Sequence, residues 1–188
     1  MSKLTVVYLK DSGHVLAALT RADPPAAGEP VGALVNKGLP VSAVDAVSAD
    51  VTVPVTNLAA VTVDDNQPDV LINPQHFQVV QDPSGQTPPQ VASIGLAAGN
   101  VALTIDTTSG AQVVVSNVFT AVSLPAVVVL QKLASPSPAP TILDPVTVTL
   151  ASPTVVADPA GFVIGDTWNM YAFVQGVRPA ASAITIMS

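Results

Sequence analysis

Apolar and polar positions alternate in short segments along most of the chain, at the two-residue spacing that is typical of β-strands. Segments 4–9 and 14–20 flank the tetrapeptide KDSG, so they predict a hairpin closed by a glycine-containing turn. Similar segments rich in Val, Thr and Ile recur up to the C-terminal end, separated by Pro, Gly, Asn and Asp. Helical spacing is not sustained for more than two turns anywhere. The pattern predicts an all-β fold of short strands with a sandwich-like architecture.

Segment 81–90, with the sequence QDPSGQTPPQ, is polar and rich in proline, which is typical of a linker. We therefore expect two small β-domains, one over residues 1–80 that begins with the hairpin and one over residues 91–188. A single larger β-sandwich is the alternative. Within these ranges we expect short strands at 31–35 and at 70–73, and two strands over 51–63.

The segment 162–175 holds most of the few aromatic residues of the chain. Read as a strand, it places Trp168 on one face and Tyr171 with Phe173 on the other, and both faces are largely apolar. Each face must therefore be covered, either by the rest of this chain or by another chain. Phe162, Trp168, Tyr171 and Phe173 are the predicted anchors of the core or of an interface with another subunit.

Charged residues make up only 10% of the 188 residues, whereas hydrophobic residues make up 49%. A surface with so little charge favours association, because few like charges keep copies of the protein apart. The net charge is −7, and the six Lys and Arg residues are spread over the whole chain. Nucleic-acid binding is not expected, since no basic patch is available to neutralise phosphates. The absence of cysteine excludes disulfides, thiolate metal sites and cysteine nucleophiles.

Segment 107–131 lacks charged residues over a length that could span a bilayer, but it contains many polar side chains and Pro125. Buried strands account for it better than a membrane helix, so we expect no membrane span. The first residues carry Lys10 and Asp11 and no small-residue cleavage site, so no secretory signal is predicted. This favours synthesis in the cytoplasm, with later release in a particle as a further option.

Three groups of residues could carry chemistry. Residues 11–14, with the sequence DSGH, contain the residue types of a hydrolase triad, but a tight turn is the expected reading because adjacent residues rarely reach triad geometry. His76, the only other histidine, has no zinc-ligand spacing around it. Asp64, Asp65 and Asp69 form an acidic cluster that leaves calcium binding open, although the same residues are ordinary turn formers.

These observations predict no catalytic residue, no cofactor and no metal site. The expected function is that of a non-enzymatic structural subunit of a larger assembly, such as a particle, a tail-like device or a filament. Its partners would be copies of itself or other subunits, held through apolar strand faces and edges. A binding module for a carbohydrate or a protein is one alternative, and it would expose Trp168 or Tyr171 at a groove. An Asp-dependent hydrolase is the second alternative, and it would bring two distant carboxylates together.

Overall fold

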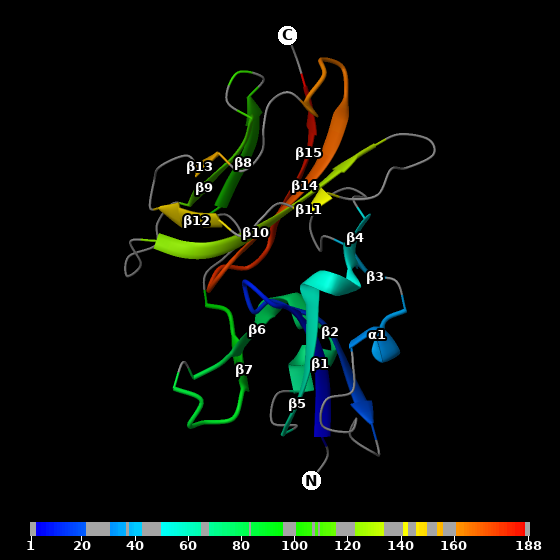
Figure 1. The fold of residues 1–188 in the computed structure, drawn as a ribbon, viewed down its shortest axis with the longest axis vertical. Helices are drawn as coiled ribbons and strands as arrows, with labels where there is room; N and C mark the ends of the chain where they lie inside the picture. Colours follow the sequence, from blue (N-terminus) through cyan, green and yellow to red (C-terminus); the bar gives the residue numbers. More distant parts are fainter. Residues whose placement is uncertain are drawn as a thin grey trace.

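The described part of the chain consists mostly of β-strands, paired in antiparallel sheets, which confirms the all-β prediction. The predicted sandwich arrangement stays a prediction. A computed structural model describes residues 3–21, 31–36, 38–42, 50–64, 68–82, 84–95, 101–106, 108, 110–115, 123–133, 141–142, 146–149, 154–155 and 161–186. We refer to residues 3–95 of this set as the N-terminal half and to residues 101–186 as the C-terminal half. Figure 1 shows the two halves at opposite ends of the long axis of the molecule.

The N-terminal half is organised around the first strand. It contains β1 (Lys3–Leu9), β2 (Val15–Arg21), α1 (Val31–Leu34), β3 (Gly38–Ser42), β4 (Asp50–Pro54), η1 (Val55–Asn57), β5 (Leu58–Asp64), η2 (Pro68–Leu71), η3 (Pro74–His76), β6 (Phe77–Val80) and β7 (Gln90–Ser93). β1 lies between β2 and β5, so its backbone is paired on both sides. β3 pairs with β4, and β6 pairs with β7.

The predicted hairpin of the first two strands is confirmed. Leu9 N–H donates to the carbonyl of His14 across the turn, and Gly13 N–H donates to the carbonyl of Leu9. Gly13 has a φ of +77°, a conformation in which L side chains are strained. A Cβ at this position would also lie 2.8 Å from the carbonyl oxygen of Val79, because β6 docks directly against the turn. Glycine is therefore required here both by the turn and by the close approach of a neighbouring strand.

Two predicted strands of the N-terminal half are wrong. Residues 31–34 form the short helix α1, in which the N–H of Val35 donates to the carbonyl of Val31. Val31, Leu34 and Val35 all pack against the same core cluster, because their spacing of three and four residues places them on one helical face. Residues 68–71 form the turn η2, which buries Val70 and leaves Ile72 75% exposed.

The C-terminal half is organised around two long, paired strands. It contains β8 (Val101–Asp106), β9 (Gly110–Val115), β10 (Ser123–Lys132), β11 (Thr141–Ile142), β12 (Val146–Thr149), β13 (Thr154–Val155), β14 (Thr167–Val174) and β15 (Ala180–Thr185). β10 pairs with β14 along most of its length, and β14 pairs with β15. β8, β9 and β13 form a separate sheet, whose strand β8 packs against β14 and β15.

Pro125 lies within β10, and the strand continues through it. It pairs with Thr147 of β12 at a point where β14 pairing has ended, since the β14 register begins at Ala126. The N–H that proline lacks is therefore not needed by β14. The carbonyl of Pro125 still accepts a hydrogen bond from the N–H of Gln175.

The β10–β14 pair is buried on both faces by its own chain. One face packs against β8, and Ala180 of the neighbouring strand β15 lies in the same C-terminal cluster, formed by Val101, Ala126, Val128, Leu130, Met170, Ala172, Val174, Val177 and Ala180. The other face packs against the N-terminal half in a middle cluster, formed by Val7, Leu9, Leu16, Val41, Val51, Val53, Leu58, Val127, Val129, Tyr171 and Phe173. A third cluster lies on the far face of β1 and includes Phe77, Val79 and Val91. The requirement for a second chain to cover the aromatic strand is thereby removed.

Residues 81, 82 and 84–89 of the predicted linker lie between β6 and β7. They form the loop of the β6–β7 hairpin, in which Val79 lies opposite Val91. The carboxylate of Asp82 accepts hydrogen bonds from the backbone N–H groups and hydroxyls of Ser84 and Thr87. These polar residues therefore form hydrogen bonds within the loop. The strand after the segment belongs to the same sheet as the strand before it. The division of the chain into two domains with a linker at residues 81–90 stays a prediction.

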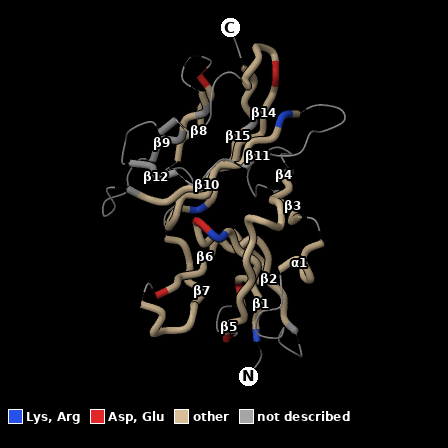
Figure 2. The backbone as a smooth tube through the Cα atoms, viewed as in Figure 1, with Lys and Arg blue, Asp and Glu red and all other residues tan. Residues whose placement is uncertain are grey.

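Charged side chains are sparse on the described trace. Figure 2 shows Lys, Arg, Asp and Glu positions spread singly or in small groups along both halves. None of the helices in the described part of the chain is long and apolar enough to cross a membrane.

Candidate interaction surfaces

Two of the four predicted aromatic anchors belong to the core. Tyr171 and Phe173 are each 1% exposed, and they point from β14 into the middle cluster. Their rings are stacked, with centroids 6.3 Å apart and an angle of 18° between the planes. Both rings contribute large apolar areas to the contact between the two halves. Tyr171 is therefore not accessible to a carbohydrate ligand in this structure.

The other two anchors lie at the margin of the core. Trp168 and Phe162 are partly buried and pack against the C-terminal cluster. Their rings meet edge to face, with centroids 5.2 Å apart and an angle of 73°. The indole Nε1 of Trp168 has no hydrogen-bond partner among the described residues. The structure thus separates the four residues into a core pair and a peripheral pair, on opposite faces of β14.

The peripheral pair adjoins an exposed apolar end of the molecule, which we define as Leu133, Val163 and Ile164. Val163 is 59% exposed, Ile164 is 62% exposed and Leu133 is 47% exposed. Because β10 and β14 are antiparallel, Leu133, just after β10, lies beside the start of β14, and Val163 and Ile164 come shortly before that start in the sequence. Leu133 N–H donates to the carbonyl of Thr167 at this point.

Residues 163–166 hold the apolar end in a defined turn. The N–H of Asp166 donates to the carbonyl of Val163, and Gly165 has a φ of +92°, which together describe a type II turn with Ile164 at its outer corner. Gly165 N–H donates to the carbonyl of Ile186, and Ile186 N–H donates to the carbonyl of Asp166. Lys132 Nζ lies 2.6 Å from Asp166 Oδ2 and ties the turn to β10. The apolar side chains are therefore held outward by a fixed backbone.

The DSGH segment forms a tight turn, as expected, but it also brings Ser12 and His14 together. His14 is 0% exposed, and its Nδ1 lies 3.0 Å from Ser12 Oγ. Its Nε2 lies 2.7 Å from the carbonyl oxygen of Val177 in the C-terminal half. A carbonyl can only accept, so Nε2 carries the proton and Nδ1 accepts from the Ser12 hydroxyl. Both side chains are buried, and the exposed Asp11 makes no described hydrogen bond to the histidine.

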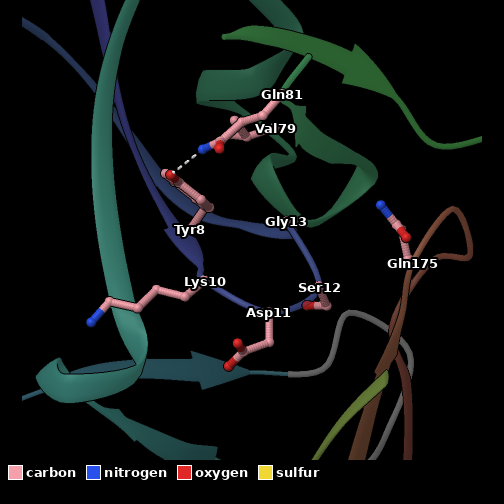
Figure 3. A pocket seen from close by; sticks show the side chains of 8 residues that line it. All are labelled: Tyr8, Lys10, Asp11, Ser12, Gly13, Val79, Gln81 and Gln175. Carbon is pink, nitrogen blue, oxygen red and sulfur yellow. Dashed lines mark hydrogen bonds between the residues drawn. The ribbon is translucent and has the colours of Figure 1, made fainter. Parts of the chain in front are cut away.

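A cleft of about 150 Å³ lies beside this turn, between the two halves. Its lining is polar and consists of Tyr8, Lys10, Asp11, Ser12, Gly13, Val79, Gln81 and Gln175. Figure 3 shows the hydrogen bond from Gln81 to the Tyr8 hydroxyl, with Gln175 across from the turn. Burial raises the pKa of Tyr8, and the hydrogen bond from Gln81 acts in the opposite direction. The Lys10 ammonium donates to the carbonyl of Thr56.

The acidic cluster that left calcium binding open is only partly covered by the described residues. Asp64 is paired with Lys3 at 2.6 Å, and this contact lowers the pKa of the Asp64 carboxyl. Asp69 lies in the first turn of η2, and Asp65 lies outside the described residues. The described part of the chain contains no group of three or more His, Asp or Glu side chains arranged to hold a metal ion.

Sequence reasoning missed the apolar end and the contact made by His14. The VIGD sequence at 163–166 does carry a turn signal, since type II turns favour glycine at the third position. No local signal could indicate that His14 meets Val177, because the two residues are 163 positions apart.

Comparison of the chain with known protein families, with curated proteins and with solved structures gives no match.

Proposed function

We propose that this protein is a non-enzymatic structural subunit of a larger protein assembly, such as a particle, a tail-like device or a filament. Association would occur through exposed apolar side chains and open sheet edges. The observation that carries the proposal is the apolar end formed by Leu133, Val163 and Ile164, which a fixed turn presents to solvent. Exposed groups of this kind are common at contacts with other proteins.

Surface composition supports the same proposal. With charged residues at 10% of the chain, little electrostatic repulsion opposes contact between copies. The peripheral pair of Trp168 and Phe162 lies next to the apolar end, and aromatic residues are frequent at the centres of protein interfaces.

Open sheet edges offer a second means of association. In the described part of the chain β15 pairs with β14 on one side only, and β7 pairs with β6 on one side only. Backbone groups on such edges can pair with a strand of another chain. The strand faces themselves contribute less than the sequence suggested, because β10 and β14 are covered on both faces by their own chain.

Sedimentation velocity over a range of concentrations tests the proposal directly. Wild-type protein is expected to show a rising average mass with concentration. The double variant Val163→Ser and Ile164→Ser is expected to weaken association, because it removes apolar area from the proposed contact. Its thermal stability should stay close to that of the wild type, since both side chains are already largely exposed.

Ile72→Ser is the matched control, because Ile72 is an isoleucine with 75% exposure in the other half of the molecule. This variant should associate as the wild type does. A wild-type protein that stays monomeric at millimolar concentration would overturn the proposal. If both variants weaken association equally, the apolar end is not the contact surface and general surface hydrophobicity is responsible.

A further inference from the structure

The two halves of the molecule meet at a buried histidine. His14 belongs to the β1–β2 turn, and its Nε2–H donates to the carbonyl of Val177 in the β14–β15 turn at 2.7 Å. The edge of its ring meets the ring of Phe173, with centroids 5.5 Å apart. Ser12 completes the contact by donating from its hydroxyl to Nδ1. Each ring nitrogen therefore has a neutral partner, and the uncharged ring satisfies both bonds as they stand.

A second hydrogen bond joins the same two turns. The N–H of Gly176 donates to Oε1 of Gln78 at 3.0 Å, and Gln78 is the bridge partner of His14 in β6. Gly176 has a φ of +78°, and Val177, which follows it, is 0% exposed. The β14–β15 turn is thus held against the N-terminal half by two side chains that are themselves neighbours.

A proton on Nδ1 would disturb this arrangement. The Ser12 hydroxyl would have to turn from donor to acceptor, and a positive charge would lie in a site closed to water. The partners of the ring among the described residues are the Ser12 hydroxyl and the backbone of Val177 and of Ser12, and no carboxylate is among them to balance the charge. The titratable and charged residues on the elements around it are Tyr8, Lys10, Asp11, His76 and Arg178.

We propose that His14 is an acid-sensitive latch, and that protonation of its ring releases the β14–β15 turn from the β1–β2 turn. The latch is a property of the fold and does not depend on the proposed structural role. Charging the ring removes the acceptor for Ser12 and makes the closed contact unfavourable. Opening the contact lets water reach the imidazolium.

The direction of the pH dependence follows from burial. Burial lowers the pKa of His14 from 6.5 to about 4, and hydrogen bonds to the backbone of Val177 and of Ser12 act in the opposite direction. Between pH 6.5 and a pH of about 4, the His14 ring is protonated in the open state but not in the closed state. The closed contact therefore has its full stability above pH 6.5 and becomes less stable as the pH falls. Below a pH of about 4, protonation of His14 causes no further loss of stability.

NMR of the full chain tests the latch. The ring nitrogens of His14 and the amides of Gly176 and Val177 are followed from about pH 7.5 to about pH 4.5. Corrected for intrinsic exchange, the hydrogen-exchange protection of the Gly176 amide is expected to fall about 70-fold over this range, if the open state titrates at the ordinary 6.5. The amides of β1 should keep their protection, because the change is confined to the contact. A Gly176 amide whose protection is unchanged while the His14 ring titrates would overturn the proposal.

Two substitutions separate the latch from general acid unfolding. In His14→Gln the side chain cannot be protonated, so Gly176 protection should no longer change with pH in this range. His76→Gln is the matched control, and it should keep the wild-type response. If His76→Gln abolishes the response, the other histidine is the sensor and the proposal is wrong. Should His14→Gln not fold, the wild-type titration decides by itself.

Discussion

Replacing Phe173 by Ala would remove a ring that joins the two halves of the molecule. The side chain is 1% exposed, stacks on Tyr171 and meets the edge of His14. Truncating a fully buried Phe to Ala costs about 3–5 kcal/mol through lost burial and the cavity that remains. The lost aromatic contacts add roughly 0.5–1.5 kcal/mol each, with incomplete additivity.

We expect Phe173→Ala to lower the free energy of unfolding by about 5 kcal/mol. This is a large part of the 5–15 kcal/mol that is usual for a domain. With an m-value of about 2 kcal/mol/M, the urea midpoint would fall by roughly 2.5 M. Circular dichroism and the fluorescence of Trp168, the only tryptophan, can follow the same transition.

Val163→Ala is the control, since Val163 is 59% exposed and its truncation should change stability by less than about 0.5 kcal/mol. Phe173→Leu should recover much of the loss, because it keeps most of the buried volume. A cost below about 1 kcal/mol for Phe173→Ala would refute the reasoning, since a fully buried ring between two halves cannot be removed so cheaply.

Two further predictions concern turns. Gly13→Ala is expected to cost at least ~2 kcal/mol, because it combines a φ of +77° with a Cβ 2.8 Å from the Val79 carbonyl oxygen. Gly85→Ala, at a φ of +68° in open space, should cost only ~1 kcal/mol, and thermal unfolding of both variants compares them. Hydrogen bonds from Ser84 lower the pKa of Asp82, so its stabilising contribution is present above 3.8 and lost as the pH falls through the lower folded value. The stability difference between wild type and Asp82→Ala should therefore shrink in acid, and a difference independent of pH would contradict this.

Local sequence determined most of the strands and turns, because their signals lie within a few residues. The KDSG hairpin, the two strands around Thr56 and Asn57, and the aromatic strand all appear where the alternation predicted them. The strands wrongly predicted at 31–35 and 70–73 are short, mainly apolar runs, in which strand and helix spacing cannot be distinguished.

The candidate interaction surfaces were only partly predictable. The sequence identified Phe162, Trp168, Tyr171 and Phe173 as anchors of a core or of an interface. Alternation correctly placed Trp168 on the face opposite Tyr171 and Phe173. It could not indicate what would cover each face, since the face of Tyr171 and Phe173 is covered by segments more than a hundred residues away.

The sequence by itself determined that this chain forms antiparallel strands with apolar residues on both faces, since side-chain alternation and backbone preference act locally. Only the tertiary structure decided what covers those faces. The N-terminal half covers one face of β14, β8 packs on the other, and His14 meets a carbonyl 163 positions away. The hydrophobic effect favours the burial of apolar area but does not specify what covers it. Whether a strand face is covered by its own chain or by another chain is therefore decided by packing.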